Sequence, residues 1–333
     1  MPRPANIRLA LTMGDPAGIG PEICAKALEP GAIPGHVVPI LVGDAALLGA
    51  VAGPDLPEVI PVADTADPGS LKPGGVYLYD LRQGGEKVSP GAASAESGRV
   101  SAAYLRGAIE LAKNGVAQGI VTAPISKDAW HMAGVDYPGH TEFLRDATGS
   151  ERTAMMFIGG GLRVALFTTH VSIAEARAAL SVEALVDFIV FLVHRLRRYG
   201  LSGLRVAVAG FNPHAGESGL FGDEEIRIIA PAIEACRRKG IDAEGPFPAD
   251  TMFAPHTRKR YDLAVALYHD QGLIPVKALA FGSAVNVTLG LPFVRTSPPH
   301  GVAYDIARNG RASAEGLLAA ITTAAELVSA SMD

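Results

Sequence analysis

IRLALTMGDPAGIGPEICAKALE, residues 7–29, is the stretch that decides the fold we predict for this chain. The apolar run 7–13 is typical of a buried strand, and the pattern of 20–29 is typical of a helix. Between them, Gly14, Gly18 and Gly20 permit a tight turn, and Pro21 suits the first turn of a helix. The stretch therefore predicts a strand, a tight turn and a helix in direct succession.

The same alternation of strand and helix continues along the chain. Short runs rich in Val, Ile and Leu predict further strands at 37–42, 76–80, 117–122, 154–159, 162–167, 204–209, 262–267 and 283–288. Helical patterns occur at 94–114, 181–199, 223–239 and 313–331. Residues 53–75, rich in Pro, Gly and Asp, are expected to be irregular surface chain. This order of elements predicts an α/β protein with a mainly parallel sheet flanked by helices.

The composition indicates a globular protein of two domains or two lobes. Of 333 residues, 48% are hydrophobic and 19% charged, which leaves ample apolar material for a core. A net charge of −5 gives no general attraction to nucleic acid or to an anionic membrane. The most apolar stretch, 184–193, is interrupted by Asp187 and is too short to span a bilayer. Two cysteines without a paired motif, and a start without a signal-peptide pattern, favour a cytoplasmic location.

The glycine-rich turn after the first strand allows two interpretations. It is either a loop that lets a ligand approach the backbone or only a tight connection between strand and helix. The spacing is not GxGxxG, and no acidic residue closes a second strand at the expected distance. An ordinary Rossmann nucleotide site is therefore not supported.

Three histidines come directly after strand-like runs: His170 in LFTTHVS, His214 in FNPHAGESG and His269 in ALYHDQG. Neutral imidazole is a common ligand of zinc and similar divalent ions, and three such ligands leave a coordination position open for substrate. Each histidine could instead be a satisfied polar residue in a loop. Their shared position after a strand favours a convergent metal site.

A possible anion site lies in 137–144, YPGHTEFL. Pro138 and Gly139 predict a turn, and Thr141 with Glu142 could begin a helix. His140 and Thr141 would then lie where backbone N–H groups converge on an anion. The alternative is that Thr141 is a simple helix cap.

Further polar side chains, some of them cationic, are embedded in apolar sequence between residues 277 and 300. Lys277, Asn286, Arg295 and His300 lie there, and Lys127 follows the strand-like run that ends at 122. An arginine in a buried run needs a partner, and its guanidinium can hold a phosphate or carboxylate with two hydrogen bonds. The alternative is an internal salt bridge to one of the acids, such as Asp15, Asp250 or Asp270.

Taken together, these motifs identify a family. In chain order they are TMGDPAGIGPEI, TAPISK, GHTEFL, NPHAGESGLFGDEE, FPADTMF, YHDQG, VNVTLGLPFVRTS and HGVAYDIA. The set resembles the 4-hydroxythreonine-4-phosphate dehydrogenase (PdxA) family, from about residue 7 to about residue 325. The resemblance implies a two-lobed fold like that of isocitrate and isopropylmalate dehydrogenases. Its cofactor-side lobe would comprise 1–128 with 288–333, and its metal, substrate and dimerisation lobe 129–287.

The resemblance also assigns roles to individual residues. The metal ligands would be His170, His214 and His269. The substrate contacts would be His140, Thr141, Lys277, Asn286 and Arg295. The contacts to the adenosine half of the cofactor would be His300, Gly301 and Asp305. Our candidates for catalytic proton transfer are Lys277 and Asp250. The family commonly has IAGKG or IAGRG where this chain has IARNG, so Arg308 and Asn309 change the cofactor loop.

The activity implied is oxidation and decarboxylation of 4-phosphohydroxy-L-threonine to 3-amino-2-oxopropyl phosphate, within pyridoxal phosphate biosynthesis. The cofactors would be NAD, with NADP as the alternative, and one divalent metal ion: zinc, magnesium or cobalt. The partner would be a second copy of the chain, with the active site at the interface. Two alternatives are the same chemistry on a 4-phosphorylated erythronate or a cis-dihydrodiol carboxylate, and a non-catalytic relative that binds metal or nucleotide. A serine or cysteine hydrolase is not supported, because the chain has no GxSxG sequence.

Overall fold

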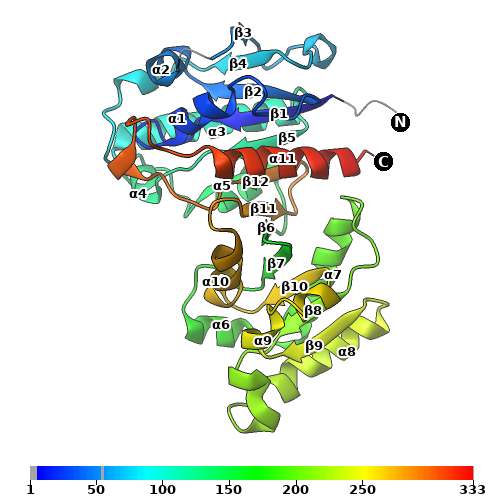
Figure 1. Ribbon diagram of the computed structural model, residues 1–333. Coiled ribbons are helices and arrows are strands. Elements are labelled where there is room, and N and C mark those ends of the chain that lie inside the picture. Colours follow the sequence, from blue (N-terminus) through cyan, green and yellow to red (C-terminus); the bar gives the residue numbers. More distant parts are fainter. Residues whose placement is uncertain (1–5, 54–55, 333) are drawn as a thin grey trace. The chain divides into compact units, whose positions relative to one another are not determined.

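The computed structural model describes residues 6–53 and 56–332 (Figure 1). The chain divides into two compact units. The first unit is Met1–Thr153 with Gly290–Asp333, and the second unit is Ala154–Leu289. Residues 129–153, which we predicted in the other lobe, lie in the first unit. The reason is local packing: α4 (Lys127–Met132) lies against α3 (Ala95–Lys113), so closely that a Cβ at Gly98 would be 2.0 Å from the Ala129 carbonyl oxygen.

The strands of the first unit all pair in parallel. Their order is β3-β4-β2-β1-β5-β12. Their bounds are β1 Ile7–Thr12, β2 Val37–Gly43, β3 Val59–Pro61, β4 Val76–Asp80, β5 Gly119–Thr122 and β12 Val294–Ser297. Every residue of β2 and β5 is buried. Continuous apolar runs are expected in a parallel sheet, because helices cover both of its faces.

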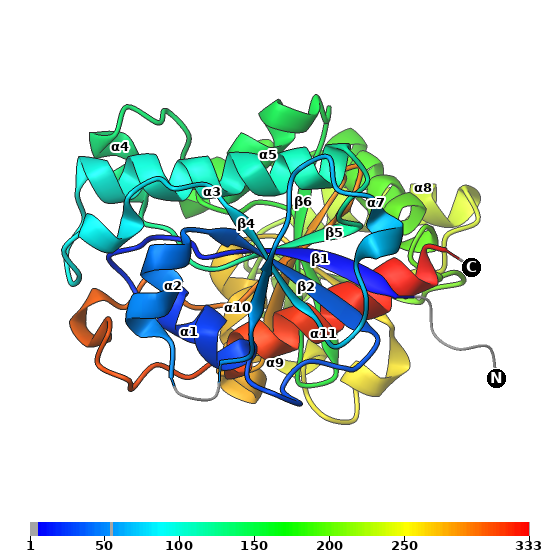
Figure 2. The same ribbon diagram turned by 90° about the horizontal axis from the view of Figure 1, so that it is seen from above.

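Helices flank the first unit's strands on two sides. Figure 2 shows α3, α4 and α5 on one side and α1, α2 and α11 on the other. Besides α3 and α4, the bounds are α1 Gly20–Ala27, α2 Ala45–Val51, α5 His140–Thr148 and α11 Glu315–Ala330. The core on the α3 side includes Trp130, Phe143 and Leu105, all buried. This core holds the start of α5 against the sheet.

The second unit has a mixed sheet with the strand order β11-β6-β7-β10-β8-β9. Its strands are β6 Ala154–Gly159, β7 Leu162–Leu166, β8 Val206–Ala209, β9 Ala243–Phe247, β10 Leu263–Ala266 and β11 Val285–Leu289. Strands β7, β10, β8 and β9 are parallel, whereas β6 is antiparallel to both β7 and β11. Gly160 and Gly161, both with positive φ, close the β6–β7 hairpin. Two such residues form the turn that matches the twist of a hairpin.

The helices of the second unit are α6 Ile173–Ala179, α7 Val182–Arg197, α8 Ala230–Arg238, α9 Ala249–Met252 and α10 His269–Ala280. A π-helical turn, Glu225–Ile229, leads directly into α8. A core of strand residues from β7, β8 and β10 packs against α10. This packing supports the carboxyl ends of these three strands.

The predicted class, α/β with mainly parallel strands flanked by helices, is confirmed. Each predicted strand and helix occurs within a few residues of its expected bounds. Strands β3, β9 and β12 and helices α2, α4, α6, α9 and α10 were not predicted. These elements are short or contain a breaker: β9 includes Gly245 and Pro246, and α10 includes Pro275. Within the described part of the chain, no helix is both long and apolar enough to cross a membrane.

Candidate active site

The predicted anion contacts of the first unit gather where α5 begins. Helix α5 starts at His140, and Gly139 occupies its N-cap position. Thr141 therefore lies inside the first turn, and its interpretation as a simple helix cap is wrong. The first N–H groups of a helix lack intrahelical partners and carry partial positive charge. The start of α5 accordingly offers donors to a negatively charged group.

Arg295 supplies a buried cation to the same unit. It lies on β12 opposite Ile120 of β5 and is only 2% exposed. Its Nη2 donates a hydrogen bond of 2.6 Å to Thr122 Oγ1. Burial lowers the pKa of Arg295 to about 10, and the Glu142 carboxylate acts in the opposite direction. The guanidinium thus remains charged at neutral pH.

His140 is the neutral counterpart of Arg295. Burial, and secondly the charge of Arg295, hold the pKa of His140 well below its usual value of 6.5. Its ring stands edge-on to Trp130, with 5.7 Å between ring centres. Its Nε2 is buried and makes no hydrogen bond within the described residues. A buried polar atom of this kind needs a partner, which a bound ligand can provide.

The acids proposed as salt-bridge partners of Arg295 are engaged or placed elsewhere. Asp15 accepts hydrogen bonds from Ala17 N (2.8 Å) and Tyr304 Oη (2.7 Å). Asp270 pairs with His269, and Asp250 is exposed on α9 of the second unit. The acid that acts on Arg295 is Glu142, from the helix that bears His140.

Lys127 reaches the same end of α5. It is exposed at the first position of α4. A Cβ placed on Gly139 would lie 3.6 Å from Lys127 Cε and 3.6 Å from Glu142 Oε2. The lysine stem thus lies beside the turn that begins α5, where its mobile charge can serve a ligand held there.

The glycine-rich turn is occupied by the protein's own backbone. A Cβ on Gly18 would lie 2.7 Å from the carbonyl oxygen of Val302, and one on Gly20 would lie 2.1 Å from that of Met13. Ile19 N donates to Val302 O at 2.9 Å. These contacts favour the second interpretation of the turn, a tight connection that permits close packing.

The predicted cofactor loop, residues 300–310, is hydrogen-bonded to that turn. Arg308, at φ 58°, donates from Nη2 to Pro16 O (3.1 Å) and Val88 O (3.2 Å). The departure from the family pattern therefore adds a tie between the loop and two other segments. Of the predicted contacts, Gly301 faces open space and Asp305 is exposed, while Nε2 of His300 is buried and makes no hydrogen bond within the described residues.

In the second unit, the three predicted metal ligands follow neighbouring parallel strands. His170 comes after β7, His269 begins α10 directly after β10, and His214 lies on the turn after β8. The ring centres of His170 and His269 are 5.7 Å apart. His269 Nδ1 lies 2.7 Å from Asp270 Oδ1, so its Nε2 is the nitrogen that faces away from this carboxylate. In the described ranges, no three His, Cys, Asp or Glu side chains form a group that could hold one metal ion.

Side-chain hydrogen bonds connect the three strand ends that carry these histidines. Thr168 Oγ1 donates to Leu267 O at 2.8 Å, which joins the ends of β7 and β10. Gln271 accepts from Leu267 N at 2.7 Å and donates to Gly210 O at 2.6 Å, which joins the ends of β10 and β8. Gln271 was not among the site residues predicted from the sequence. Its position in the YHDQG motif was the only available signal.

The remaining predicted residues of the second unit lie on regular elements. Lys277 is half-buried on α10. Asn286 lies on β11 opposite Phe157, and its Oδ1 is buried without a hydrogen bond to any described residue. Asp250 lies in the first turn of α9.

Residues 36–324 match the model of the family described as "Pyridoxal phosphate biosynthetic protein PdxA". The chain belongs to this family.

A 4-hydroxythreonine-4-phosphate dehydrogenase from Desulfosudis oleivorans is 46% identical over 97% of this chain and 96% of its own length. A D-threonate 4-phosphate dehydrogenase from Salmonella typhimurium is 42% identical over 96% of this chain and 98% of its own. A solved structure of 4-hydroxythreonine-4-phosphate dehydrogenase from Klebsiella pneumoniae is 42% identical, with a TM-score of 0.84 over 97% of this chain and 99% of that one. As a member of the PdxA family the chain is an oxidoreductase.

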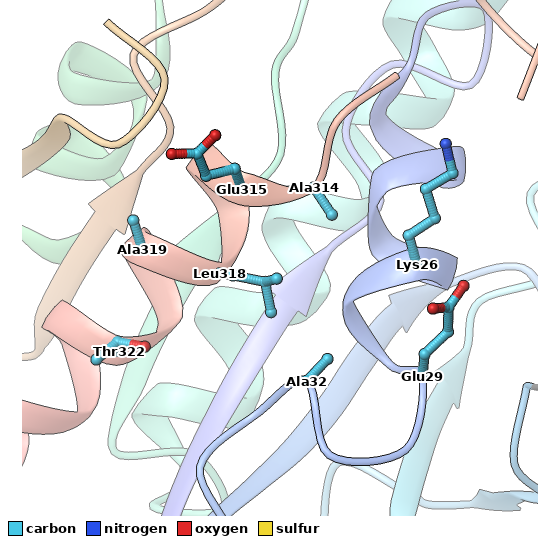
Figure 3. A pocket seen from close by; sticks show the side chains of 8 residues that line it. All are labelled: Lys26, Glu29, Ala32, Ala314, Glu315, Leu318, Ala319 and Thr322. Atoms are coloured by element: carbon cyan, nitrogen blue, oxygen red, sulfur yellow. The ribbon is translucent and has the colours of Figure 1, made fainter. Parts of the chain in front are cut away.

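One groove of this PdxA-family chain lies away from every predicted site residue. It has a volume of about 680 Å³ and runs between α1 and α11 of the first unit (Figure 3). Its lining residues are Lys26, Glu29, Ala32, Ala314, Glu315, Leu318, Ala319 and Thr322. Lys26 Nζ already binds Glu22 and the carbonyl oxygens of Gly310 and Ala312. The lysine therefore fastens the end of the predicted cofactor loop to α1.

Proposed function

We propose that this chain oxidises and decarboxylates 4-phosphohydroxy-L-threonine to 3-amino-2-oxopropyl phosphate, with NAD as hydride acceptor and one divalent metal ion. The single observation that carries this proposal is the pairing of buried Arg295 with neutral His140 at the start of α5. A buried cation beside an unpartnered ring nitrogen and free helix N–H groups forms a recognition site for a phosphate dianion. The names of the relatives support the same substrate class.

In this proposal the first unit holds the substrate phosphate. Arg295 donates from its guanidinium, His140 from Nε2 and Thr141 from its hydroxyl and backbone N–H. Burial of Arg295 keeps water from competing for these donors, which strengthens each contact. Because His140 is neutral, it adds a hydrogen bond without adding a second charge beside Arg295. Held at its phosphate, the substrate has a defined orientation for reaction at its other end.

The histidines of the second unit fit a divalent metal in part. Two imidazoles that bind one ion have ring centres roughly 5–6 Å apart, which agrees with the 5.7 Å between His170 and His269. Asp270 would hold His269 in the tautomer that leaves Nε2 available. We propose His214 as the third ligand. A bound metal would act as a Lewis acid toward the substrate hydroxyl and the carbonyl that replaces it.

We propose that His214 reaches this metal across the contact between two copies of the chain. Large apolar side chains of the second unit lie exposed close in sequence to His170 and His214 and along α10, the helix that His269 begins. They are Val171, Ile173, Leu220, Phe221, Ile274 and Phe281. Exposed large apolar side chains are typical of a surface that another protein covers. A homodimer with the active site at its interface accounts for the exposure and for the position of His214.

Proton transfer falls to Lys277 or Asp250 in this proposal. A base takes the hydroxyl proton as hydride leaves the same carbon, and carbon dioxide is then lost from the resulting keto acid. The enolate that remains after this loss takes up one proton. This balances the proton removed from the hydroxyl, so the reaction releases no net proton. Lys277 is half-buried on α10, and Asp250 is exposed on α9. Asn286 Oδ1, buried without a hydrogen bond to any described residue, is available to the substrate amino group.

The loop 300–310 is the proposed contact for the adenosine half of NAD, through His300, Gly301 and Asp305. The buried Nε2 of His300 can serve a ligand, and Gly301 leaves room beside it. The ties from Tyr304 and Arg308 hold the loop in place before the cofactor binds. NADP is the alternative cofactor. We further propose that the enzyme acts in the cytoplasm.

The test is a substrate panel with purified protein, NAD or NADP, and Zn²⁺, Mg²⁺ or Co²⁺. Reduced cofactor is followed by absorbance and carbon dioxide by trapping. We expect turnover of 4-phosphohydroxy-L-threonine and none of its unphosphorylated form. Absence of turnover with every phosphorylated hydroxy acid, cofactor and metal would refute the proposal.

A second candidate substrate is D-threonate 4-phosphate, which a relative at 42% identity is named for. The phosphate site does not distinguish the two compounds, because both carry the same group. They differ at the carbon that bears an amino group or a hydroxyl. A higher kcat/KM for D-threonate 4-phosphate, or for the erythronate isomer, in the same panel would move the assignment to a sugar acid.

A further inference from the structure

The turn that carries His214 has an unusual backbone. His214, Ala215, Gly216, Glu217 and Ser218 form a continuous run with φ between 43° and 80°. In this left-handed region the Cβ of an L residue approaches a carbonyl oxygen, so single residues occur there but runs are rare. Four of these five residues are not glycine. Such a run persists only where surrounding groups hold it.

The group that holds the start of the turn is the carboxylate of Glu225. This side chain is only 3% exposed. Its Oε1 accepts hydrogen bonds from Phe211 N (2.7 Å) and Asn212 N (2.8 Å), and its Oε2 accepts from Asn212 Nδ2 (3.0 Å). A buried carboxylate with three donors fixes the backbone just before His214.

The turn itself closes around the same carboxylate. A Cβ on Gly216 would lie 2.6 Å from Glu225 Oε2, and one on Gly210 would lie 3.1 Å from Oε1. Glycine at these two positions lets the backbone come this close. Glu225 therefore lies inside the turn and contacts it both before and after His214.

A second acid supports the arrangement from outside. Glu224 accepts from Asn212 Nδ2 at 2.6 Å and pairs with Arg177 of α6. Glu225 opens the π-helical turn Glu225–Ile229 that leads into α8. The wider π turn is a feature often found at functional sites. Both acids thus come from one rigid element of the second unit.

We propose that Glu225 is the positioning residue for His214: its carboxylate holds the left-handed turn that presents this imidazole to the metal. Glu225 touches neither metal nor substrate in this proposal and acts only through the turn. The inference rests on the proposed role of His214 as a metal ligand. It predicts that metal affinity depends on a residue eleven positions away whose side chain binds the backbone of the loop.

The experiment uses the full-length protein, freed of metal with a chelator and then titrated with Co²⁺ alone. Binding is read from the visible absorption of the bound ion. Glu225→Ala should weaken Co²⁺ binding at least about 10-fold, the range found for residues that orient a ligand. Glu225→Gln should be intermediate, because one amide oxygen can still accept from the two backbone N–H groups while its NH₂ faces the Asn212 NH₂. Glu234→Gln, on α8 and directed to Arg237, is the matched control and should bind Co²⁺ as wild type.

Hydrogen exchange of the metal-free protein gives a readout that does not depend on activity. In Glu225→Ala the amides of 211–221 should exchange faster, while those of β8 and α8 stay as in wild type. Faster exchange throughout the unit would mean a general loss of stability and would overturn the proposal. If Glu225→Ala does not fold, Glu225→Gln decides: weaker Co²⁺ binding with an unchanged melting temperature supports the proposal.

Wild-type Co²⁺ affinity in the decisive variant overturns this inference and leaves the proposed function intact. A wild-type protein that binds no Co²⁺ contradicts the proposed metal dependence and the inference together. The two failures are therefore distinguishable.

Discussion

The two proposed binding regions, one in each unit, are built in opposite ways. In the first unit, Arg295 and His140 lie on a strand and on a helix whose backbones are regular; burial keeps His140 neutral, whereas Arg295 remains charged. In the second unit, His214 lies on a left-handed turn that contradicts the preference of most of its residues. A phosphate site needs fixed donors in a dry place, which regular elements provide. A ligand projected from a loop needs an added restraint, and here Glu225 provides it.

The largest effect expected from a single change is the loss of a metal ligand. His214→Ala should reduce metal-dependent turnover at least about 1000-fold, since a Lewis acid contributes several kcal/mol to such reactions. The fold should persist, because the His214 side chain is exposed. Turnover and far-ultraviolet circular dichroism of the same sample provide the measurement. Unchanged turnover would remove His214 from the metal site.

Arg295→Ala, in the first unit, should produce the next largest effect. Removing a buried charge from an ion pair costs about 2–5 kcal/mol, so kcat/KM for the phosphorylated substrate should fall about 30-fold to 5000-fold. Metal affinity should not change, because no metal ligand is altered. Arg99→Ala is the control, since Arg99 forms an exposed pair with Glu96. Equal losses of metal and substrate affinity would contradict the proposal that the first unit binds the substrate phosphate and the second unit binds the metal.

A matched pair of glycine substitutions compares the two backbones directly. Gly216→Ala should lower the free energy of unfolding by about 1–3 kcal/mol, because φ is 80° and Glu225 occupies the place of the new Cβ. Gly139→Ala, at φ 167°, should change it by less than about 0.5 kcal/mol, since its Cβ would meet ordinary contacts at 3.6 Å. Urea denaturation of both variants tests the comparison. Similar losses would show that the left-handed turn is not strained.

The smallest effect is a dependence of stability on pH that belongs to the first unit. The pKa of His140 is lower in the folded protein than in the unfolded chain, so the unfolded chain binds the proton first as pH falls. The free energy of unfolding should then decrease below about pH 6.5, by at most about 1.4 kcal/mol per pH unit from this group. His140→Gln should lose that part of the slope between pH 7.5 and 5.5. His131→Gln, exposed on α4, is the control; an identical slope in all three proteins would contradict a neutral His140.

Local pattern was sufficient wherever local preference and tertiary packing agree. The buried strands β1, β2, β4 and β6 were predicted because their short apolar runs have strand length and are bounded by turn residues. Strand β12 was missed because VRTS is short and contains Arg295, a residue that pattern alone does not place in a core. The direction of β6 was also missed. The glycine run at 159–161 was the available signal, since two glycines with positive φ suit a hairpin.

By itself the sequence determined the α/β class, the family, and which histidines follow strands, because these depend on residue types and spacings that are visible along one chain. Only the tertiary structure decided that His140 is neutral, that Arg295 is buried against Thr122, and that the turn at His214 is left-handed. Desolvation and hydrogen bonds between distant residues set these properties. No local stretch of sequence contains both partners, so no local pattern could predict them.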